Sequence, residues 1–461
     1  MTFQLYLGDG RHRPSTTLRM SQILAPLSHA LDMTEGQPPG HCVRCCYVGT
    51  RLGQQLGMAG EALSDLYYTL LLKDLGCSSN AARICALYLT DDISFKRDFK
   101  TIDGSLSSAL RFVFSKTGLE SGLSERFRAI VHIMQNGGDI SRELIDTRCQ
   151  RGAEIAAKMR FSKAVQAGIM ALDEHWDGGG KPEGLAGTAI PRAGNIALLA
   201  QVLDVFHRGD GRDAAMTEVR RRSGTWFDPD LVSAMERLAR DAGFWADLND
   251  PHIADIVFQL PPAENETPVT EGFLDDVATA FSDVVDAKSP YTADHSGRVT
   301  LYTDMIAEEM GLSTRHRRWL RRGALLHDLG KLGVSNQVLD KPAKLDDAEW
   351  TMIRHHPTNG ARVLSQIDAY ADIAPIAHGH HEKLGGGGYP LGLGGEEISL
   401  EVRMVTIADV FDALSAERPY RGPIPIADVF EMMRKEVGSA FDGACLDALE
   451  CGMARFSQTR H

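Results

Sequence analysis

Apolar residues recur along this chain at the spacing of amphipathic helices, and the alternation typical of strands is sparse. Residues 231–238 predict one such helix. Residues 273–285 predict another, because Phe273, Val277 and Phe281 fall on one face at helical spacing. The same pattern continues through residues 299–326. We therefore predict an all-α fold.

A stretch rich in proline and polar residues divides the chain into two halves. It runs from Leu260 to Pro268 and cannot propagate a helix or a sheet, because proline lacks the backbone N–H. A length of 461 residues is ample for two domains. We predict two tandem helical bundle domains, residues 1–258 and 270–461, joined by a linker at residues 259–269.

Composition and charge exclude several classes of protein. The chain is 43% hydrophobic and 24% charged, and it has no run of 18 apolar residues that would predict a transmembrane helix. Its amino terminus lacks the basic start and long apolar stretch of a secretory signal, so we expect a cytoplasmic protein with no membrane partner. A formal net charge of −13 disfavours binding to DNA or RNA polymers. Among the eight cysteines, packing is favoured over metal or redox use.

The second half carries six histidine and aspartate residues of the kind that bind metal ions. They are His327, Asp328, His356, His380, His381 and Asp409. Imidazole and carboxylate groups suit iron, manganese and zinc, and the lack of cysteine among them argues against a structural zinc finger. A single buried histidine is more often a hydrogen-bonded core residue than a ligand. Six such residues in separate segments, bracketed by apolar residues or glycines, instead favour a two-metal hydrolytic site.

These segments resemble the HD-GYP family, a subset of HD-superfamily phosphohydrolases that hydrolyse cyclic di-GMP in bacteria. The resemblance covers about residues 270–455, and its motifs occur in order and with the usual spacing. The motifs are Asp294-His295-Ser296-Gly297-Arg298, His327-Asp328-Leu329-Gly330-Lys331, His356-Pro357, His380-His381-Glu382, Gly388-Tyr389-Pro390, Ala408-Asp409-Val410-Phe411-Asp412 and Arg418-Pro419-Tyr420-Arg421. The fold that this resemblance implies is an HD-type helical bundle.

The resemblance also implies a metal centre. Two divalent ions, iron or manganese, would be held by His327, Asp328, His356, His380, His381 and Asp409, with Asp328 bridging them. His295 occupies a position that serves a third metal in some members. Those members carry a glutamate four residues earlier, where this chain has Tyr291, so two metals are favoured over three.

Four further residues match substrate-binding positions of the family. Lys331 would reach a substrate phosphate and act with Asp328 in catalysis, as suits a compact charge on a flexible stem. Tyr389, Arg418 and Arg421 match positions that contact the dinucleotide.

The activity implied is hydrolysis of a cyclic dinucleotide, with cyclic di-GMP favoured, to linear pGpG and, after a second cut, GMP. The family's Asp-Gly-x-Gly-Tyr-Pro motif begins here with Gly385, which predicts a more mobile loop and leaves open a hydrolase of another nucleotide. An alternative of another class is an effector that binds metal or cyclic dinucleotide, turns over poorly and signals to a protein partner.

The first half resembles a degenerate copy of the same domain. An offset of 254 (328 − 74) places Asp74 on Asp328, and the same offset places His41 on His295. Lys73 then replaces the metal-binding histidine, and we expect Asp204 at the position of Asp409. Four further substitutions remove the site: Arg148 stands for His356, Leu172 and Asp173 for the histidine pair, and Lys181 for Tyr389.

The altered residues predict a different role for this half. We expect no metal there, since a lysine ammonium repels a dication and Lys73 could pair with Asp74 or Asp204 instead. The spacing between shared motifs is 46 residues longer than in the second half (78 − 32), which predicts extra helices around residues 80–140. A scaffold or partner-contacting domain, for example in a homodimer, is favoured over a ligand sensor.

Overall fold

The apolar pattern of the sequence is realised as helices. The computed structural model describes residues 19–102, 106–119, 121–260, 269–417 and 421–458. Within these ranges the chain forms helices and four isolated β-bridges but no strand, which confirms the all-α prediction. The helices of the first half are α1 (Met20–Thr34), α2 (His41–Gln55), α3 (Gly60–Leu72), η1 (Cys77–Asn80), α4 (Ala81–Tyr88), α5 (Asp92–Phe99), α6 (Leu106–Lys116), α7 (Leu123–Lys158), α8 (Lys163–Met170), η2 (Gly187–Ala189), α9 (Arg192–Asp210), α10 (Arg212–Arg221), α11 (Pro229–Leu238), α12 (Ala242–Leu248) and α13 (Ile253–Phe258).

The second half repeats this style of structure with fewer elements. Its helices are α14 (Glu271–Asp286), η4 (Pro290–Thr292), α15 (His295–Glu309), α16 (Thr314–Leu326), η5 (Leu329–Gly333), α17 (Asn336–Leu339), α18 (Asp347–Arg354), α19 (His356–Leu364), α20 (Ala374–Gly379), η6 (Gly395–Glu397), α21 (Leu400–Ser415), α22 (Ile426–Arg434) and α23 (Gly443–Gln458). None of the described helices is both long enough and apolar enough to cross a membrane.

The helices predicted from periodicity lie where expected. Helix α14 starts after Thr270, whose hydroxyl accepts the Phe273 N–H, and it buries Phe273, Val277 and Phe281. The predicted helix at residues 231–238 is α11, which Pro229 opens at its first turn. The pattern over residues 299–326 is divided between α15 and α16, because Gly311 between them takes a positive φ of 76° that ends the first helix.

Equivalent helices pack alike in the two halves. Helix α2 packs against α3 and α9, and its counterpart α15 packs against α16 and α21. Helices α7 and α8 form the same pair as α19 and α20. The internal repeat predicted from the sequence is therefore a structural repeat.

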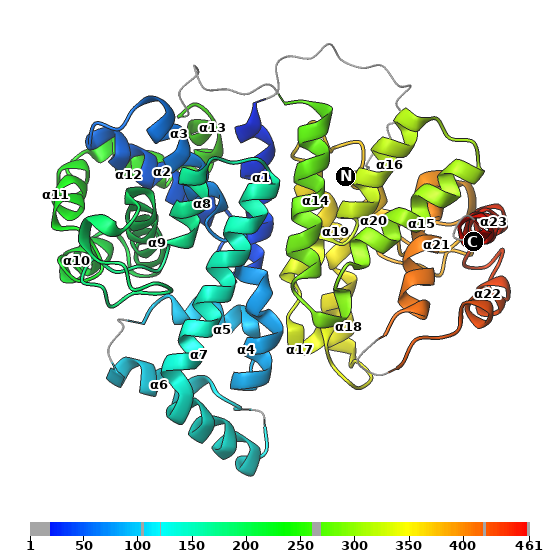
Figure 1. The fold of residues 1–461 in the computed structure, drawn as a ribbon, viewed down its shortest axis with the longest axis horizontal. Helices are drawn as coiled ribbons and strands as arrows, with labels where there is room; N and C mark the ends of the chain where they lie inside the picture. The colour runs from blue at the N-terminus through cyan, green and yellow to red at the C-terminus, as the bar shows by residue number, and fades with distance from the viewer. Residues whose placement is uncertain (1–18, 103–105, 120, 261–268, 418–420, 459–461) are drawn as a thin grey trace.

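The extra residues of the first half form a projection with its own small core. Helices α4, α5, α6 and the amino-terminal part of the 36-residue α7 extend away from the repeated bundle, in the lower part of Figure 1. Their contacts bury Ile84, Phe95, Phe112 and Ile133 in a cluster separate from the main core. The prediction of added helices around residues 80–140 is confirmed.

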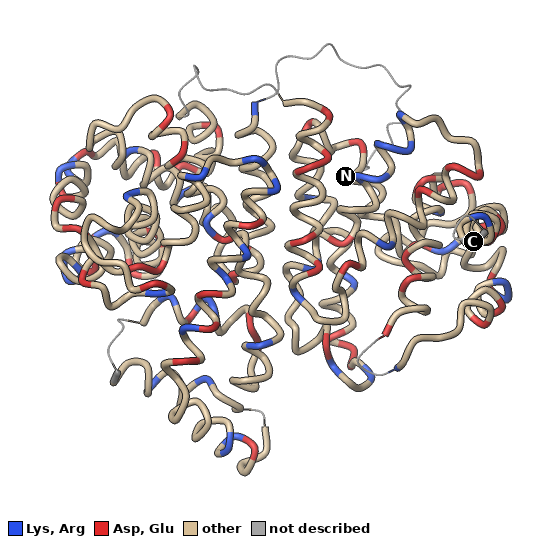
Figure 2. Tube along the Cα trace, in the orientation of Figure 1, with Lys and Arg blue, Asp and Glu red and all other residues tan. Residues whose placement is uncertain are grey.

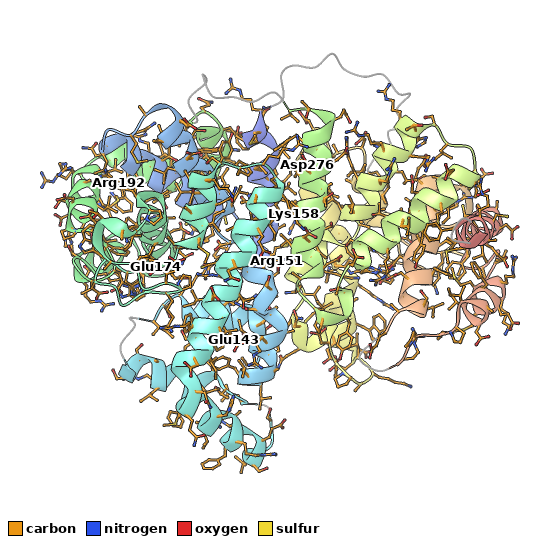
Figure 3. All side chains as sticks on the ribbon, viewed as in Figure 1. Glu143, Arg151, Lys158, Glu174, Arg192 and Asp276 are labelled. Carbon is orange, nitrogen blue, oxygen red and sulfur yellow. The ribbon has the colours of Figure 1, made fainter. Side chains whose placement is uncertain are left out.

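The two halves pack tightly against each other. One continuous apolar core contains residues of both halves, and helix α14 lies against α7 of the first half. Arg160, just after α7, pairs with Asp276 of α14 at 2.6 Å, and Figure 3 shows Lys158 and Asp276 on these adjacent helices. Most of the predicted linker, residues 261–268, lies outside the described residues, and the proposed domain boundaries stay a prediction.

A buried aspartate links the projection to the second half. Asp92, at the start of α5, accepts hydrogen bonds from Lys96 at 3.2 Å and from the Asn336 backbone N–H at 2.9 Å. The buried Lys288 ammonium lies 3.5 Å from Asp92 Oδ2, the oxygen that also accepts from Lys96. Elsewhere, basic and acidic residues are interleaved over both halves (Figure 2).

Candidate metal centre

Helix ends bring the candidate ligands together from distant parts of the second half. His327 ends α16 and Asp328 follows it, whereas His356 begins α19. This convergence depends on Gly330, because a Cβ at that position would lie 1.9 Å from the His356 carbonyl oxygen. The absence of a side chain thus allows the segment after Asp328 to lie directly against α19. His380 follows α20 and Asp409 lies within α21.

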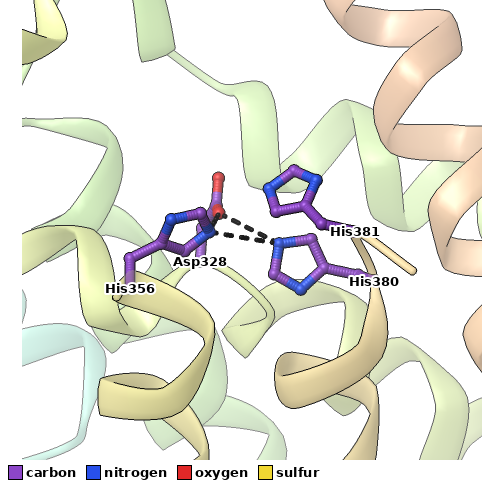
Figure 4. A group of neighbouring side chains, drawn as sticks. All are labelled: Asp328, His356, His380 and His381. Atoms are coloured by element: carbon purple, nitrogen blue, oxygen red, sulfur yellow. Dashed lines mark hydrogen bonds and ion pairs between the residues drawn. The ribbon is translucent and has the colours of Figure 1, made fainter. Parts of the chain in front are cut away.

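One group of donors surrounds one oxygen of Asp328. The Nε2 atoms of His356 and His380 lie 3.3 Å and 3.6 Å from Asp328 Oδ1. Together with His381, these residues place one donor atom each within 4.8 Å of one another (Figure 4). Asp328, His356 and His380 are fully buried, so the group is shielded from solvent.

A second group surrounds the other oxygen of Asp328. His327 Nε2 lies 3.3 Å and His295 Nε2 lies 3.4 Å from Asp328 Oδ2. Asp409 Oδ1 lies 3.4 Å from His295 Nε2, and His295, His327 and Asp409 form a second cluster within 4.8 Å. The two carboxylate oxygens of Asp328 therefore face two separate donor groups. His295 belongs to the second of them, and its role at a third metal stays untested.

Backbone contacts orient three of the imidazoles. The Nδ1 atoms of His327, His356 and His380 lie 2.6, 2.6 and 2.8 Å from the carbonyl oxygens of Ala324, Ile353 and Ala377. A carbonyl oxygen only accepts, so each Nδ1 must donate its proton. Each Nε2 is then left with a lone pair directed into the cluster. A hydrogen bond from the other ring nitrogen to a backbone carbonyl oxygen is the usual second contact of a metal-binding histidine.

The buried polar atoms of the cluster fit divalent metal ions. His295 Nε2, His327 Nε2 and Asp328 Oδ1 are buried and have no hydrogen-bond partner among the described residues. Such atoms are costly unless something satisfies them, and a cation would do so. The donor set contains imidazole and carboxylate groups alone, which suits iron and manganese.

The protonation states of the first donor group agree with this fit, whereas in the second group the facing aspartates raise the pKa values of His295 and His327 despite their burial. Burial lowers the pKa of His356 to about 4 and also lowers the pKa of His380 and His381, so these imidazoles are neutral. Burial alone would raise the pKa of Asp328, but the charges of His327 and Lys331 hold it well below its usual value. A neutral imidazole and an ionised carboxylate are the ligand forms that bind metal.

Comparison with known proteins agrees with this geometry. A family model described as the HD domain matches residues 120–231 and 279–445, more than half of the chain. The chain belongs to the HD-domain family. The match includes parts of both halves, as expected if the first is a degenerate copy of the HD domain.

Curated and solved relatives extend the similarity over nearly the whole chain. The 3'3'-cGAMP-specific phosphodiesterase 3 of Vibrio cholerae is 50% identical over 434 residues, 94% of each protein. A crystal structure of a cyclic GMP-AMP specific phosphodiesterase of V. cholerae aligns with a TM-score of 0.65 and 45% identity, covering 95% of this chain and 98% of that one. A cyclic di-GMP phosphodiesterase response regulator of Xanthomonas campestris is 39% identical over 163 residues, 35% of this chain and 43% of its own. The similarity to the 3'3'-cGAMP-specific protein thus includes both HD halves.

Two of the predicted substrate-binding residues lie at the metal centre. Lys331 pairs with Asp328 and keeps its side chain partly exposed. Tyr389 stacks on His381, with ring centroids 4.8 Å apart. Both side chains are therefore placed beside the cluster.

The two arginines predicted to bind substrate are placed differently. Arg421 donates to the carbonyl oxygens of Leu414 and Ala413 at 2.9 and 2.8 Å, so it caps the carboxyl end of α21. This geometry gives no support to a substrate contact by Arg421. Arg418 lies outside the described residues.

The glycine-rich loop is tied to the HD core by a residue that sequence reasoning missed. Glu382 is buried and accepts the backbone N–H groups of Leu391 at 2.7 Å and Leu393 at 3.0 Å. Gly385, which replaces the family aspartate, donates its own N–H to Ser439 at 2.7 Å. These contacts restrain the loop at both ends, and its predicted mobility stays a prediction. Glu174 accepts equivalent bonds in the first half. A glutamate at the same position of both sequence copies was therefore the signal that could have identified Glu382.

Asp412 is a second functional residue that the sequence analysis did not single out. Its Oδ2 lies 2.7 Å from His295 Nδ1, and its Oδ1 accepts a bond of 2.6 Å from Arg298 Nε. Asp412 therefore orients His295 toward the metal centre. Asp204 makes the same contacts with His41 and Arg44 in the first half, at 2.7 and 2.6 Å.

This equivalence corrects the register predicted for the first half. Asp204 corresponds to Asp412 and not to Asp409, an offset of 208 (412 − 204). The position of the candidate ligand Asp409 is then held by Gln201, a neutral amide. Lys73 confirms the new register, because its Nζ contacts Gln201 Oε1 at 3.0 Å.

The Lys73 ammonium lies among the first-half residues that are equivalent to the candidate metal ligands. It pairs with Asp74, as predicted, and lies 3.2 Å from His41 Nε2. Burial would lower the pKa of Lys73, but the Asp74 carboxylate holds it well above its usual value. Arg148, at the position of His356, pairs with Asp173. The prediction that this half binds no metal stays a prediction.

Proposed function

We propose that this HD-domain protein is a metal-dependent phosphodiesterase that opens a cyclic dinucleotide by hydrolysis. The observation that carries the proposal is the placement of two donor groups on the two oxygens of Asp328. Two divalent ions bound there would supply a water of lowered pKa and polarise the phosphoryl oxygens. No serine or cysteine nucleophile is required.

The protein's own residues hold and complement this chemistry. Asp328 stays ionised and faces both donor groups, and the carbonyl contacts keep the histidine Nε2 atoms directed inward. Lys331, beside Asp328, offsets negative charge on the phosphate undergoing attack. Tyr389, stacked on His381, forms part of the wall next to the reacting group.

We propose 3'3'-cGAMP as the preferred substrate. The motifs alone favour cyclic di-GMP, but they cover the second half only. The 3'3'-cGAMP-specific relative is similar over 94% of the chain, including the degenerate half, whereas the cyclic di-GMP relative from Xanthomonas is similar over 35%. This preference replaces the one drawn from the motifs.

Hydrolysis by purified protein tests the proposal. Protein prepared without air and supplied with Mn²⁺ or Fe²⁺ is given 3'3'-cGAMP or cyclic di-GMP, and products are separated by chromatography. We expect linear product, a higher kcat/KM for 3'3'-cGAMP, and loss of activity in His327→Ala. His316→Ala is the matched control, because His316 is a partly exposed histidine on the same helix α16. If wild-type turnover is no greater than that of His327→Ala, the proposed hydrolytic activity is refuted and the alternative of a binding effector is favoured.

A further inference from the structure

The short helix α18 presents unburied apolar side chains beside the metal centre. It buries none of its residues, and Trp350 and Met352 are 44% and 50% exposed. The helix is nevertheless well anchored, because Asp346 and Glu349 form a capping box and Lys341 binds Glu349 at 2.6 Å. Its last turn leads directly into His356. An anchored helix thus holds an exposed indole close to the ligands.

Trp350 is the outer end of a line of ring contacts that begins at the metal ligands. Tyr389 stacks on His381, and the Arg354 Cζ lies 5.6 Å from the Tyr389 ring centroid. The same Cζ lies 5.8 Å from the Trp350 ring centroid. Both are cation–π distances. Trp350 and Arg354 are four residues apart and share a helix face, whereas Met352 points elsewhere. We call Trp350, Arg354 and Tyr389 the aromatic wall.

Arg354 keeps hydrogen-bonding capacity within this wall. Its contacts within the described chain are the two rings, and no carboxylate of that part of the chain pairs with it. A guanidinium carries five N–H donors in a fixed plane. Guanine offers two acceptors, O6 and N7, to such a plane, whereas adenine offers one acceptor and one donor.

We propose that the aromatic wall holds one purine base of the substrate, with Trp350 as a stacking surface and Arg354 favouring guanine. The inference rests on the proposed function, since the phosphate at the metal centre fixes where the base must lie. The first half lacks the wall as well as the ligands: with the offset of 208, Arg142, Asp146 and Lys181 occupy the three positions.

Steady-state kinetics on variants of α18 test the wall. Trp350→Ala should raise KM for 3'3'-cGAMP roughly ten-fold while kcat changes little, because stacking of a base is lost. Trp350→Phe should retain most of the affinity. Arg354→Lys should reduce the preference for cyclic di-GMP over cyclic di-AMP by roughly ten-fold. Met352→Ala is the matched control on the same helix and should behave as wild type.

Binding without turnover separates this inference from the proposed function. Binding of 3'3'-cGAMP to EDTA-treated protein is measured by calorimetry for wild type, Trp350→Ala and Met352→Ala. Weaker binding in Trp350→Ala alone supports the wall, whether or not the protein hydrolyses the ligand. Equal affinity and equal KM in Trp350→Ala and Met352→Ala overturn it, even if wild-type hydrolysis is rapid.

Discussion

Removal of the Asp92 carboxylate should destabilise the contact between the two halves. The side chain of Asp92 is fully buried at the base of the projection, next to the buried ammonium groups of Lys96 and Lys288. Burial would raise the pKa of Asp92, but Lys288 and Lys96 hold it below its usual value, so the group is ionised. Asp92→Ala leaves two buried cations without this counter-charge.

The expected cost follows from the contacts that each lysine retains. Lys96 still donates to the Thr34 carbonyl oxygen at 3.0 Å, whereas the described contacts give Lys288 no acceptor other than Asp92. Breaking a buried ion pair by removing one partner costs about 3–5 kcal/mol. Replacing both partners by apolar groups is far milder. Asp92→Ala combined with Lys288→Met should therefore return to within about 2 kcal/mol of wild type, the remainder reflecting the unpaired Asn336 N–H.

Urea unfolding followed by circular dichroism measures these differences. Asp91→Ala is the matched control, because Asp91 caps α5 through its side chain and makes no contact with Lys288. Its loss should cost about 1 kcal/mol, and Lys288→Met should not restore it. If Asp92→Ala costs less than about 1 kcal/mol, or if Lys288→Met gives no recovery, the buried charges do not hold the halves together.

Three further predictions concern the two HD halves. Lys73→Ala should leave bound metal unchanged, as measured by mass spectrometry of the purified protein, because Arg148 and Leu172 stand where the second half has His356 and His380; a rise in metal would contradict the account of this site. Gly330→Ala should abolish metal binding and activity, since its Cβ would meet a backbone oxygen at 1.9 Å, whereas the equivalent Gly76→Ala should lower stability and retain metal. Burial lowers the pKa of His175 to about 4, below the unfolded value near 6.5. Between these two pKa values the unfolded chain binds a proton at His175 and the folded chain does not. The free energy of unfolding should therefore decrease as the pH is lowered from 6.5 to 4, by on the order of 1 kcal/mol because His175 is partly exposed. His175→Phe should weaken this dependence in thermal melts at several pH values, and an unchanged profile would refute the assignment.

The helices and the gathering of the candidate ligands could be predicted because both depend on local sequence signals. Phe273, Val277 and Phe281 recur at helical spacing, and that spacing fixes which face of α14 is buried. The ligands occupy short motifs whose order is diagnostic of a family. Residue types alone then indicate metal chemistry, since imidazole and carboxylate groups are ligands that suit iron and manganese.

The register of α9 could not be predicted for a geometric reason. The tripeptide Asp204-Val205-Phe206 imitates Asp409-Val410-Phe411, but a shift of three residues is nearly one helical turn and keeps the same face inward. The contacts of Asp204 with His41 and Arg44, and that of Lys73 with Gln201, show that Asp204 matches Asp412. The place of His295 in the second donor group likewise depends on distances that sequence spacing does not encode.

The ammonium of Lys73 is a cation that arrives with the polypeptide and cannot be chelated away. We therefore expect the first half to fold independently of the supply of divalent metal ions. In a cell starved of such ions, hydrolysis at the proposed site in the second half would stop while the first half still folded. Renewed supply would then restore the proposed activity without new protein synthesis.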